Sequence, residues 1–172
     1  NGCKRFLLTS SGGVYGPQPS SLAEIPEDFC GIPDPLSLTS TYGLGKRMAE
    51  HLCKVYADQH GLKFIIARCF AFVGEDLPLD AHFAIGNFIR DALSRTEIIV
   101  NGNGKPVRSY MDQRDLAHWL MTLLQSGQEG HAYNVGSNLG LSISELAHLV
   151  RDTIAPSKQV KIMGDNGKDQ AH

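Results

Sequence analysis

The chain has 172 residues, of which 42% are hydrophobic and 20% are charged, and its formal net charge is −2. This amount of apolar material is enough for a globular protein with a sizeable core. The small net charge gives no electrostatic reason to expect nucleic acid as a partner, and no apolar run approaches the roughly 20 residues of a membrane-spanning helix. We therefore expect partners of neither kind.

The predicted elements alternate between strands and helices. A short buried strand at Lys4–Leu8 leads into the small residues of TSSGG, and a turn-rich loop with five prolines occupies residues 17–40. A helix over Tyr42–His60 and a strand over Lys63–Phe70 follow. This strand, helix, strand order is typical of βαβ units and predicts an α/β protein.

The second half of the chain continues the alternation after an irregular stretch at residues 74–79. The periodicity predicts helices over Phe83–Ser94, Leu116–Gln125 and Leu141–Ile154, and strands over Glu97–Val100, Val107–Met111, His131–Gly136 and Val160–Met163. Ser142 and Glu145 have capping-box spacing at the start of the last helix. Trp119 and Met121 are interpreted as core side chains.

Cysteine and histidine usage predicts reduced thiols and no metal site. The four cysteines are widely spaced and contain no CxxC pair: Cys3, Cys30, Cys53 and Cys69. The seven histidines show no ligand spacing such as HxxxH. Reduced thiols are typical of cytoplasmic proteins, so we expect a cytoplasmic location.

Small hydroxyl residues follow the first predicted strand and give the first functional signal. Ser10 and Ser11 are followed by Gly12 and Gly13, whose backbone can pass close to another group. In open α/β sheets, small molecules bind beyond the carboxyl ends of the strands. The stretch is therefore either a ligand site or an ordinary transition from a strand to a loop, and these residues alone do not distinguish the two interpretations.

A tyrosine and a lysine at the start of the first predicted helix give the second signal. Tyr42 and Lys46 in YGLGK are four residues apart and share one helical face. A nearby ammonium favours the phenolate, so Tyr42 can serve as a general base or acid. Such a pair is also common on exposed helices, but Ser11 at a strand end 31 residues earlier favours a functional interpretation.

Five motifs in the same order, SSGGVYG, YGLGK, RCFAFVG, GNGKPVRSYMDQRDLA and YNVGS, resemble the extended short-chain dehydrogenase/reductase superfamily. The resemblance is greatest to the NAD-dependent nucleotide-sugar epimerases and dehydratases. It implies a partial Rossmann-type, doubly wound sheet with C-terminal substrate-binding α/β elements. Residues 1–75 are then the C-terminal part of an NAD-binding domain. Residues 76–172 mostly bind the nucleotide sugar and are interleaved with the first part.

The same resemblance implies roles for the hydroxyl, tyrosine and lysine residues. Ser11 hydrogen-bonds the sugar hydroxyl, Tyr42 exchanges its proton, and Lys46 holds the nicotinamide ribose and favours the phenolate. Ser10, Tyr42 and Lys46 are the expected contacts of NAD, with NADP not excluded. The helix over Tyr42–His60 is the expected surface of a homodimer.

Three further residues are expected to bind the nucleotide-sugar substrate. By resemblance, Asn87 and Arg90 lie near its diphosphate, and Arg108 reaches its phosphates, for which a planar guanidinium fork is well suited. A solvated helix face is the alternative interpretation of Arg90.

Two departures from the family pattern bear on the reaction. The family's 4,6-dehydratases have an Asp-Glu pair where this chain has Gly12 and Gly13, and many members have an Asn at the position of Ala71. A glycine cannot move a proton, so we expect an epimerase that oxidises the sugar transiently at C4. The alternatives are a 4,6-dehydratase with acids from elsewhere, and a catalytically inactive chain that serves only as a folded or dimerising module.

We expect residues 1–172 alone to bind NAD very weakly. Members of the family hold the pyrophosphate at a GxxGxxG turn before a helix, and no such motif occurs in this sequence, which we therefore expect to be the C-terminal portion of a longer enzyme. Calorimetric titration of the purified chain with NAD measures the affinity. A micromolar dissociation constant would contradict this expectation.

Overall fold

The computed structural model describes residues 2–81 and 83–164. The chain divides into two compact units: unit 1 comprises Asn1–Phe72 and Asp112–Gly136, and unit 2 comprises Val73–Met111 and Ser137–His172. Each unit is therefore assembled from two separate stretches of sequence. The assignment of residues 1–75 to cofactor binding and of residues 76–172 to the substrate stays a prediction.

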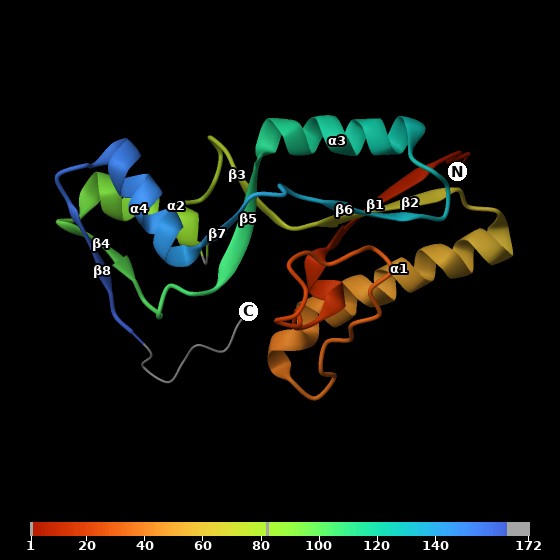
Figure 1. The fold of residues 1–172 in the computed structure, drawn as a ribbon. Helices are drawn as coiled ribbons and strands as arrows, with labels where there is room; N and C mark the ends of the chain where they lie inside the picture. The colour runs from red at the N-terminus through yellow and green to blue at the C-terminus, as the bar shows by residue number, and fades with distance from the viewer. Residues whose placement is uncertain (1, 82, 165–172) are drawn as a thin grey trace. The chain divides into compact units, whose positions relative to one another are not determined.

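Unit 1 is built on a parallel three-stranded sheet with the strand order β1-β2-β6 (Figure 1). Its strands are β1 (Phe6–Ser11), β2 (Phe64–Cys69) and β6 (Ala132–Val135). The first four residues of β2, FIIA, are all buried. A continuous apolar run is typical of a central parallel strand that is covered on both faces.

Two helices cover the opposite faces of this sheet, α1 (Thr41–His60) and α3 (Gln113–Ser126) (Figure 1). α1 ends at His60 and is followed by Gly61, whose φ of 67° is the left-handed conformation that favours glycine after a helix. α3 begins after Asp112, whose side chain accepts a hydrogen bond from the Arg114 N–H. A parallel sheet between two helical layers confirms the predicted α/β class and the doubly wound arrangement.

The first strand is longer than the sequence predicts. The predicted end at Leu8 is wrong, because β1 stays paired with β2 from Phe6 opposite Phe64 to Ser11 opposite Cys69. The chain leaves the sheet only at Gly12, where the short helix η1 (Gly12–Tyr15) begins. The hydroxyl residues therefore lie on the rigid end of a strand rather than in a loop.

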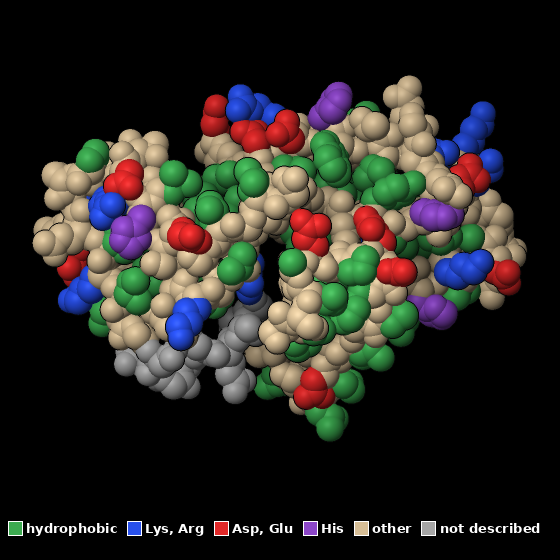
Figure 2. Space-filling model, viewed as in Figure 1, with side chains coloured by type: hydrophobic (Ala, Val, Ile, Leu, Met, Phe, Trp, Pro, Cys, Tyr) green, Lys and Arg blue, Asp and Glu red, His purple; other side chains and the backbone are tan. Residues whose placement is uncertain are grey.

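The predicted core role of Trp119 and Met121 is also wrong. Trp119 is 44% exposed and Met121 is 66% exposed, and α3 has no buried residue. Figure 2 shows hydrophobic side chains at the surface over this helix. α3 contacts β1 and β2 of the sheet, and Trp119 and Met121 lie on the exposed part of the helix.

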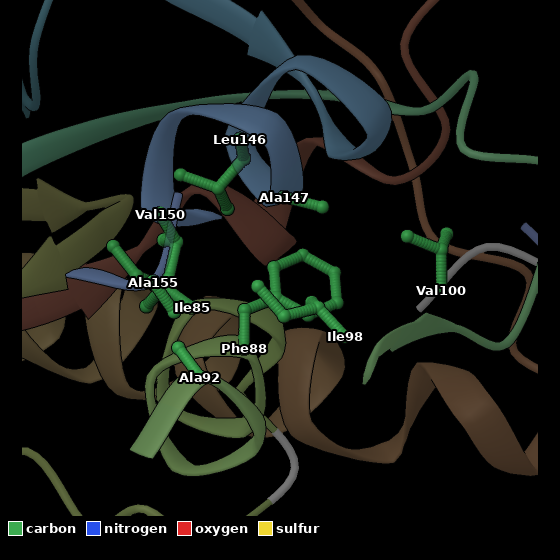
Figure 3. Close-up of a cluster of buried hydrophobic side chains, with 9 residues drawn as sticks. All are labelled: Ile85, Phe88, Ala92, Ile98, Val100, Leu146, Ala147, Val150 and Ala155. Carbon is green, nitrogen blue, oxygen red and sulfur yellow. The ribbon is translucent and has the colours of Figure 1, made fainter. Parts of the chain in front are cut away.

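Unit 2 has its core between two helices and a pair of parallel strands. α2 (Ala84–Ser94) and α4 (Ile143–Ile154) pack on β4 (Glu97–Val100), which pairs with β8 (Gln159–Ile162). The buried side chains come from all three of these packed elements and from Ala155 (Figure 3). Ser142 and Glu145 form the predicted capping box at the start of α4.

A second sheet has the strand order β3-β5-β7, and two of its three strands were not predicted. They are β3 (Ala71–Val73) and β7 (Gly140–Ser142), which flank the predicted β5 (Val107–Asp112). Each has only three residues, too few for a periodic pattern to show. Within residues 2–81 and 83–164, no helix is both long and apolar enough to cross a membrane.

Replacing Gly43 by alanine is expected to destabilise the protein by about 1–3 kcal/mol, the usual cost of overpacking. Gly43 lies in the first turn of α1, and a Cβ atom there would lie 2.3 Å from the carbonyl oxygen of Gly13. Gly45 is the matched control, because a Cβ atom there meets nothing within 4 Å. Gly45→Ala should therefore stabilise the helix by about 0.5–1 kcal/mol. Urea denaturation measures both, and equal effects would contradict the close approach.

Candidate active site

The three residues predicted to act on the sugar come together in unit 1, where β1 ends against the start of α1. Ser11 is the last residue of β1, and its Oγ accepts a hydrogen bond from the Gly13 N–H at 3.1 Å. A Cβ atom on Gly13 would lie 3.5 Å from Ser11 Oγ and 3.7 Å from Tyr42 Cδ1. Ser11 and Tyr42 therefore both lie beside Gly13.

Lys46 lies one helical turn after Tyr42 and faces the same strand end. Its Nζ donates to the Thr9 carbonyl at 2.8 Å and lies 5.7 Å from the centre of the Tyr42 ring. An ammonium has three N–H donors, and the bond to Thr9 uses one of them. Tyr42 is 62% exposed, so a ligand can reach its hydroxyl. The predicted contact of Tyr42 and Lys46 with NAD stays a prediction.

Ser10 lies directly beneath this site and is almost fully buried. It is 3% exposed, and its hydroxyl donates to Glu50 Oε1 at 2.5 Å. Glu50 also accepts two hydrogen bonds from Arg68, from Nε to Oε1 at 3.0 Å and from Nη2 to Oε2 at 2.8 Å. The Ser10 hydroxyl is therefore already bonded to Glu50 inside the protein. The expected contact of Ser10 with the cofactor stays a prediction.

Arg68 extends these bonds to the third strand of the sheet. Its Nη1 donates to the Tyr15 hydroxyl at 2.7 Å, and Tyr15 donates to Asn134 Oδ1 at 2.7 Å. Burial lowers the pKa of Arg68, but the hydrogen bonds with Glu50 and Tyr15 outweigh it and hold this pKa above its ordinary value. Burial raises the pKa of Tyr15, which keeps its phenol neutral. A continuous polar network thus joins α1 to all three strands.

Sequence reasoning missed this network. An arginine inside the apolar run of β2 was an available signal, because a charged residue is rarely buried without a partner. Glu50 also stands four residues after Lys46 on the same helical face. Neither feature reveals from sequence alone that Arg68 and Glu50 are partners.

A cavity of about 480 Å³ in unit 1 does not mark the predicted catalytic residues. It is lined by Tyr15, Glu50 and Arg68 of the network and by the loop around Phe29, and the residues lining it do not include Ser11, Tyr42 or Lys46. Tyr42 instead lies on an open surface.

Gly12 and Gly13 differ in the space around them. A Cβ atom on Gly12 would lie 2.7 Å from the Phe70 ring, so a side chain there requires that ring to move. The nearest atoms to a Cβ on Gly13 lie at 3.5 Å or more, which is ordinary contact. Packing accounts for glycine at position 12, and nothing in the structure explains glycine at position 13.

Asn87, Arg90 and Arg108, the residues predicted to bind substrate, lie in unit 2. Arg90 Nη1 donates to Asn87 Oδ1 at 3.0 Å, and its Nη2 lies 3.0 Å from Oδ1 of Asp91, which is 2% exposed. Much of the Arg90 guanidinium is therefore engaged in unit 2 itself. Arg108 is exposed on β5, where its Nη1 donates to the Val107 carbonyl at 2.8 Å. Diphosphate binding by all three stays a prediction.

No metal centre accompanies these residues in the described part of the chain: among residues 2–81 and 83–164, no group of three or more His, Cys, Asp or Glu side chains could hold an ion. The cysteines Cys3, Cys30, Cys53 and Cys69 are all unpaired thiols.

Comparison with known proteins identifies relatives of the whole chain. The model of the NAD dependent epimerase/dehydratase family matches residues 1–136. UDP-glucuronic acid decarboxylase 5 of Arabidopsis thaliana is 33% identical over 165 residues, which are 96% of this chain and 48% of that protein. The chain thus spans about half the length of this curated relative.

Two solved structures share the fold. UDP-N-acetylglucosamine 4-epimerase of Methanobrevibacter ruminantium M1, in complex with UDP-N-acetylmuramic acid, has a TM-score of 0.81 and 21% identity over 94% of this chain and 50% of its own. RMD of Pseudomonas aeruginosa, complexed with NADPH, has a TM-score of 0.79 and 26% identity over 93% of this chain and 53% of its own.

Proposed function

Because the chain belongs to the NAD-dependent epimerase/dehydratase family, we propose that it supplies the catalytic residues of a nucleotide-sugar epimerase that works by transient oxidation at C4. The observation that carries this proposal is that Ser11 and Tyr42 both lie beside Gly13, with the Lys46 ammonium 5.7 Å from the centre of the Tyr42 ring. A hydroxyl, a phenol and an ammonium are the groups that proton exchange at a sugar hydroxyl requires.

Each residue has a defined task in this mechanism. Tyr42 takes the proton of the C4 hydroxyl and later returns it. Ser11 accepts from the Gly13 N–H, which leaves its own O–H free to donate to the same sugar oxygen. Lys46 places its ammonium 5.7 Å from the centre of the Tyr42 ring and holds the ribose of the cofactor. When bound, NAD supplies a hydride acceptor for C4 and then the hydride donor.

The surroundings of Ser11 favour epimerisation over 4,6-dehydration. Dehydration requires one group to remove the C5 proton and another to protonate the departing hydroxyl. Gly12 and Gly13 offer no side chain for either task. In the proline-rich loop, the carboxylate of Glu27 accepts a hydrogen bond from the Asn134 N–H at 3.0 Å and is already engaged.

The similarity to a UDP-glucuronic acid decarboxylase favours a second candidate, decarboxylation. Oxidation of a hexuronic acid at C4 places a carbonyl β to the C6 carboxylate. The C5–C6 bond then breaks with loss of CO2, its electron pair passes into an enolate, and C5 is protonated. Return of the hydride to the C4 carbonyl would complete the reaction and regenerate NAD. This route starts from the same oxidation and requires no base at Gly12 or Gly13.

We further propose that α1 pairs with a second copy of the chain. Met48, Leu52 and Tyr56 recur every four residues and form one exposed apolar face of α1. Figure 2 shows hydrophobic side chains at the surface on this side of unit 1. Such a face is typical of a helix that is covered in an oligomer.

Tyr42→Phe in the complete enzyme is expected to lower kcat by about 10²- to 10⁴-fold, the usual range for a positioned acid or base. Binding of NAD, followed by calorimetry, should persist because Lys46 is unchanged. Tyr56→Phe is the matched control, since Tyr56 is an exposed tyrosine on the same helix. Wild-type turnover by Tyr42→Phe would disprove the assignment.

The products formed in deuterated water should distinguish the candidate reactions. With UDP-, dTDP- and GDP-hexoses and UDP-glucuronic acid as substrates, we expect one hexose to change configuration at C4 without carbon-bound deuterium, because the same hydride returns. Mass spectrometry and NMR of the products measure this.

Three other outcomes would contradict epimerisation. A 4-keto-6-deoxy product with deuterium at C5 would identify a dehydratase, and release of CO2 from UDP-glucuronic acid would identify a decarboxylase. Failure to turn over any sugar would favour the inactive module.

A further inference from the structure

Two side chains one helical turn apart tie α1 to successive residues at the end of β1. Lys46 Nζ donates to the Thr9 carbonyl at 2.8 Å, and Glu50 accepts from the Ser10 hydroxyl at 2.5 Å. The next residue of β1 is Ser11. We propose that Ser10 and Glu50 are positioning residues that set the separation of Ser11 and Tyr42, an inference that rests on the proposed function.

The first supporting observation is that Glu50 is held on both sides. Ser10 and Arg68 are register partners on the adjacent strands β1 and β2, and both donate to the Glu50 carboxylate. The helix is therefore bonded to two strands at the same level of the sheet. A slide of α1 along β1 would break the bonds to both strands together.

The second supporting observation is that these bonds are buried and charge-assisted. Ser10 is almost fully buried, and the side chains of Arg68 and Glu50 are 15% and 10% exposed. Hydrogen bonds to ionised groups are shorter and stronger than neutral ones, and a low local dielectric strengthens them further. Ser10, Glu50 and Arg68 thus form a stiff link directly below the reacting groups.

The third supporting observation concerns the start of α1, where the helix contacts η1. Gly43 meets the carbonyl of Gly13, and Arg47 Nη1 donates to the Val14 carbonyl at 3.0 Å. Those contacts hold α1 against η1, while Glu50 holds it against β1. With both points fixed, the helix is held against the strand end, so Tyr42 keeps its place beside Gly13 and near Ser11. Such fixed geometry is what makes proton transfer efficient.

Ser10→Ala in the complete enzyme tests this proposal most directly, because it removes one hydroxyl and leaves the Glu50–Arg68 pair intact. We expect kcat to fall about 10- to 100-fold, as for a displacement of about 1 Å at a reacting centre. The KM for the sugar and the dissociation constant of NAD should change less than about twofold, since Ser10 is buried. A weakened NAD affinity with unchanged kcat would make Ser10 a cofactor contact and overturn the proposal.

Glu50→Gln tests whether the two residues act through one bond. Its kcat should also fall, and the Ser10→Ala/Glu50→Gln double variant should resemble the more impaired single variant. Independent contributions would instead multiply the two fold-changes in kcat. A multiplicative double variant would overturn the proposal.

Ile65→Ala is the control for general loosening of unit 1. Ile65 is fully buried in β2 and lies beside Gly127 after α3, on the face of the strand opposite Arg68. Its kcat per folded molecule, with the folded fraction measured by circular dichroism, should stay within about twofold of wild type. A loss of kcat equal to that of Ser10→Ala would overturn the positioning role.

Tyr42→Phe measured in parallel separates this proposal from the proposed function. If Tyr42→Phe is inactive while Ser10→Ala and Glu50→Gln keep wild-type kcat, the positioning role alone is wrong. If Tyr42→Phe keeps wild-type kcat, the proposed function is wrong and the positioning role falls with it.

Discussion

The approach of the Gly43 backbone to the Gly13 backbone is the contact on which the candidate site depends. A Cβ atom at Gly43 would overlap the Gly13 carbonyl, so α1 can reach η1 only with glycine at this position. Because α1 comes this close, Tyr42 stands beside Gly13, two residues after Ser11. The two glycines thus bring together side chains that lie far apart in sequence, and they contribute no reactive group themselves.

The buried charges of unit 1 are placed so that each has a partner. An isolated guanidinium between two strands would be very unfavourable, but Arg68 faces a carboxylate on one side and a phenol and a carbonyl on the other. Removing a partner would leave a buried charge without compensation. The same requirement favours the observed register of β1 and β2, because it places Ser10 and Arg68 side by side where both can donate to Glu50.

Local signals were sufficient for part of the fold and part of the site. The spacing of Tyr42 and Lys46 and the capping box at Ser142 depend on neighbours within one helical turn, so the sequence predicts them directly. The end of β1 could not be predicted, because it depends on pairing with β2, more than fifty residues later in the chain. The exposure of Trp119 likewise depends on what packs against α3.

The ring of Phe70 links the chemistry available beside Ser11 to a residue in another part of unit 1. Phe70 joins β2 to β3, and its ring fills the space that a side chain at position 12 would need. On its other side, a Cβ atom at Gly136 would lie 3.3 Å from the Phe70 Cβ. An acidic residue can therefore enter position 12 only together with a rearrangement at position 70. In evolutionary terms the two positions are coupled, because the effect of an acidic residue at position 12 depends on the side chain at position 70.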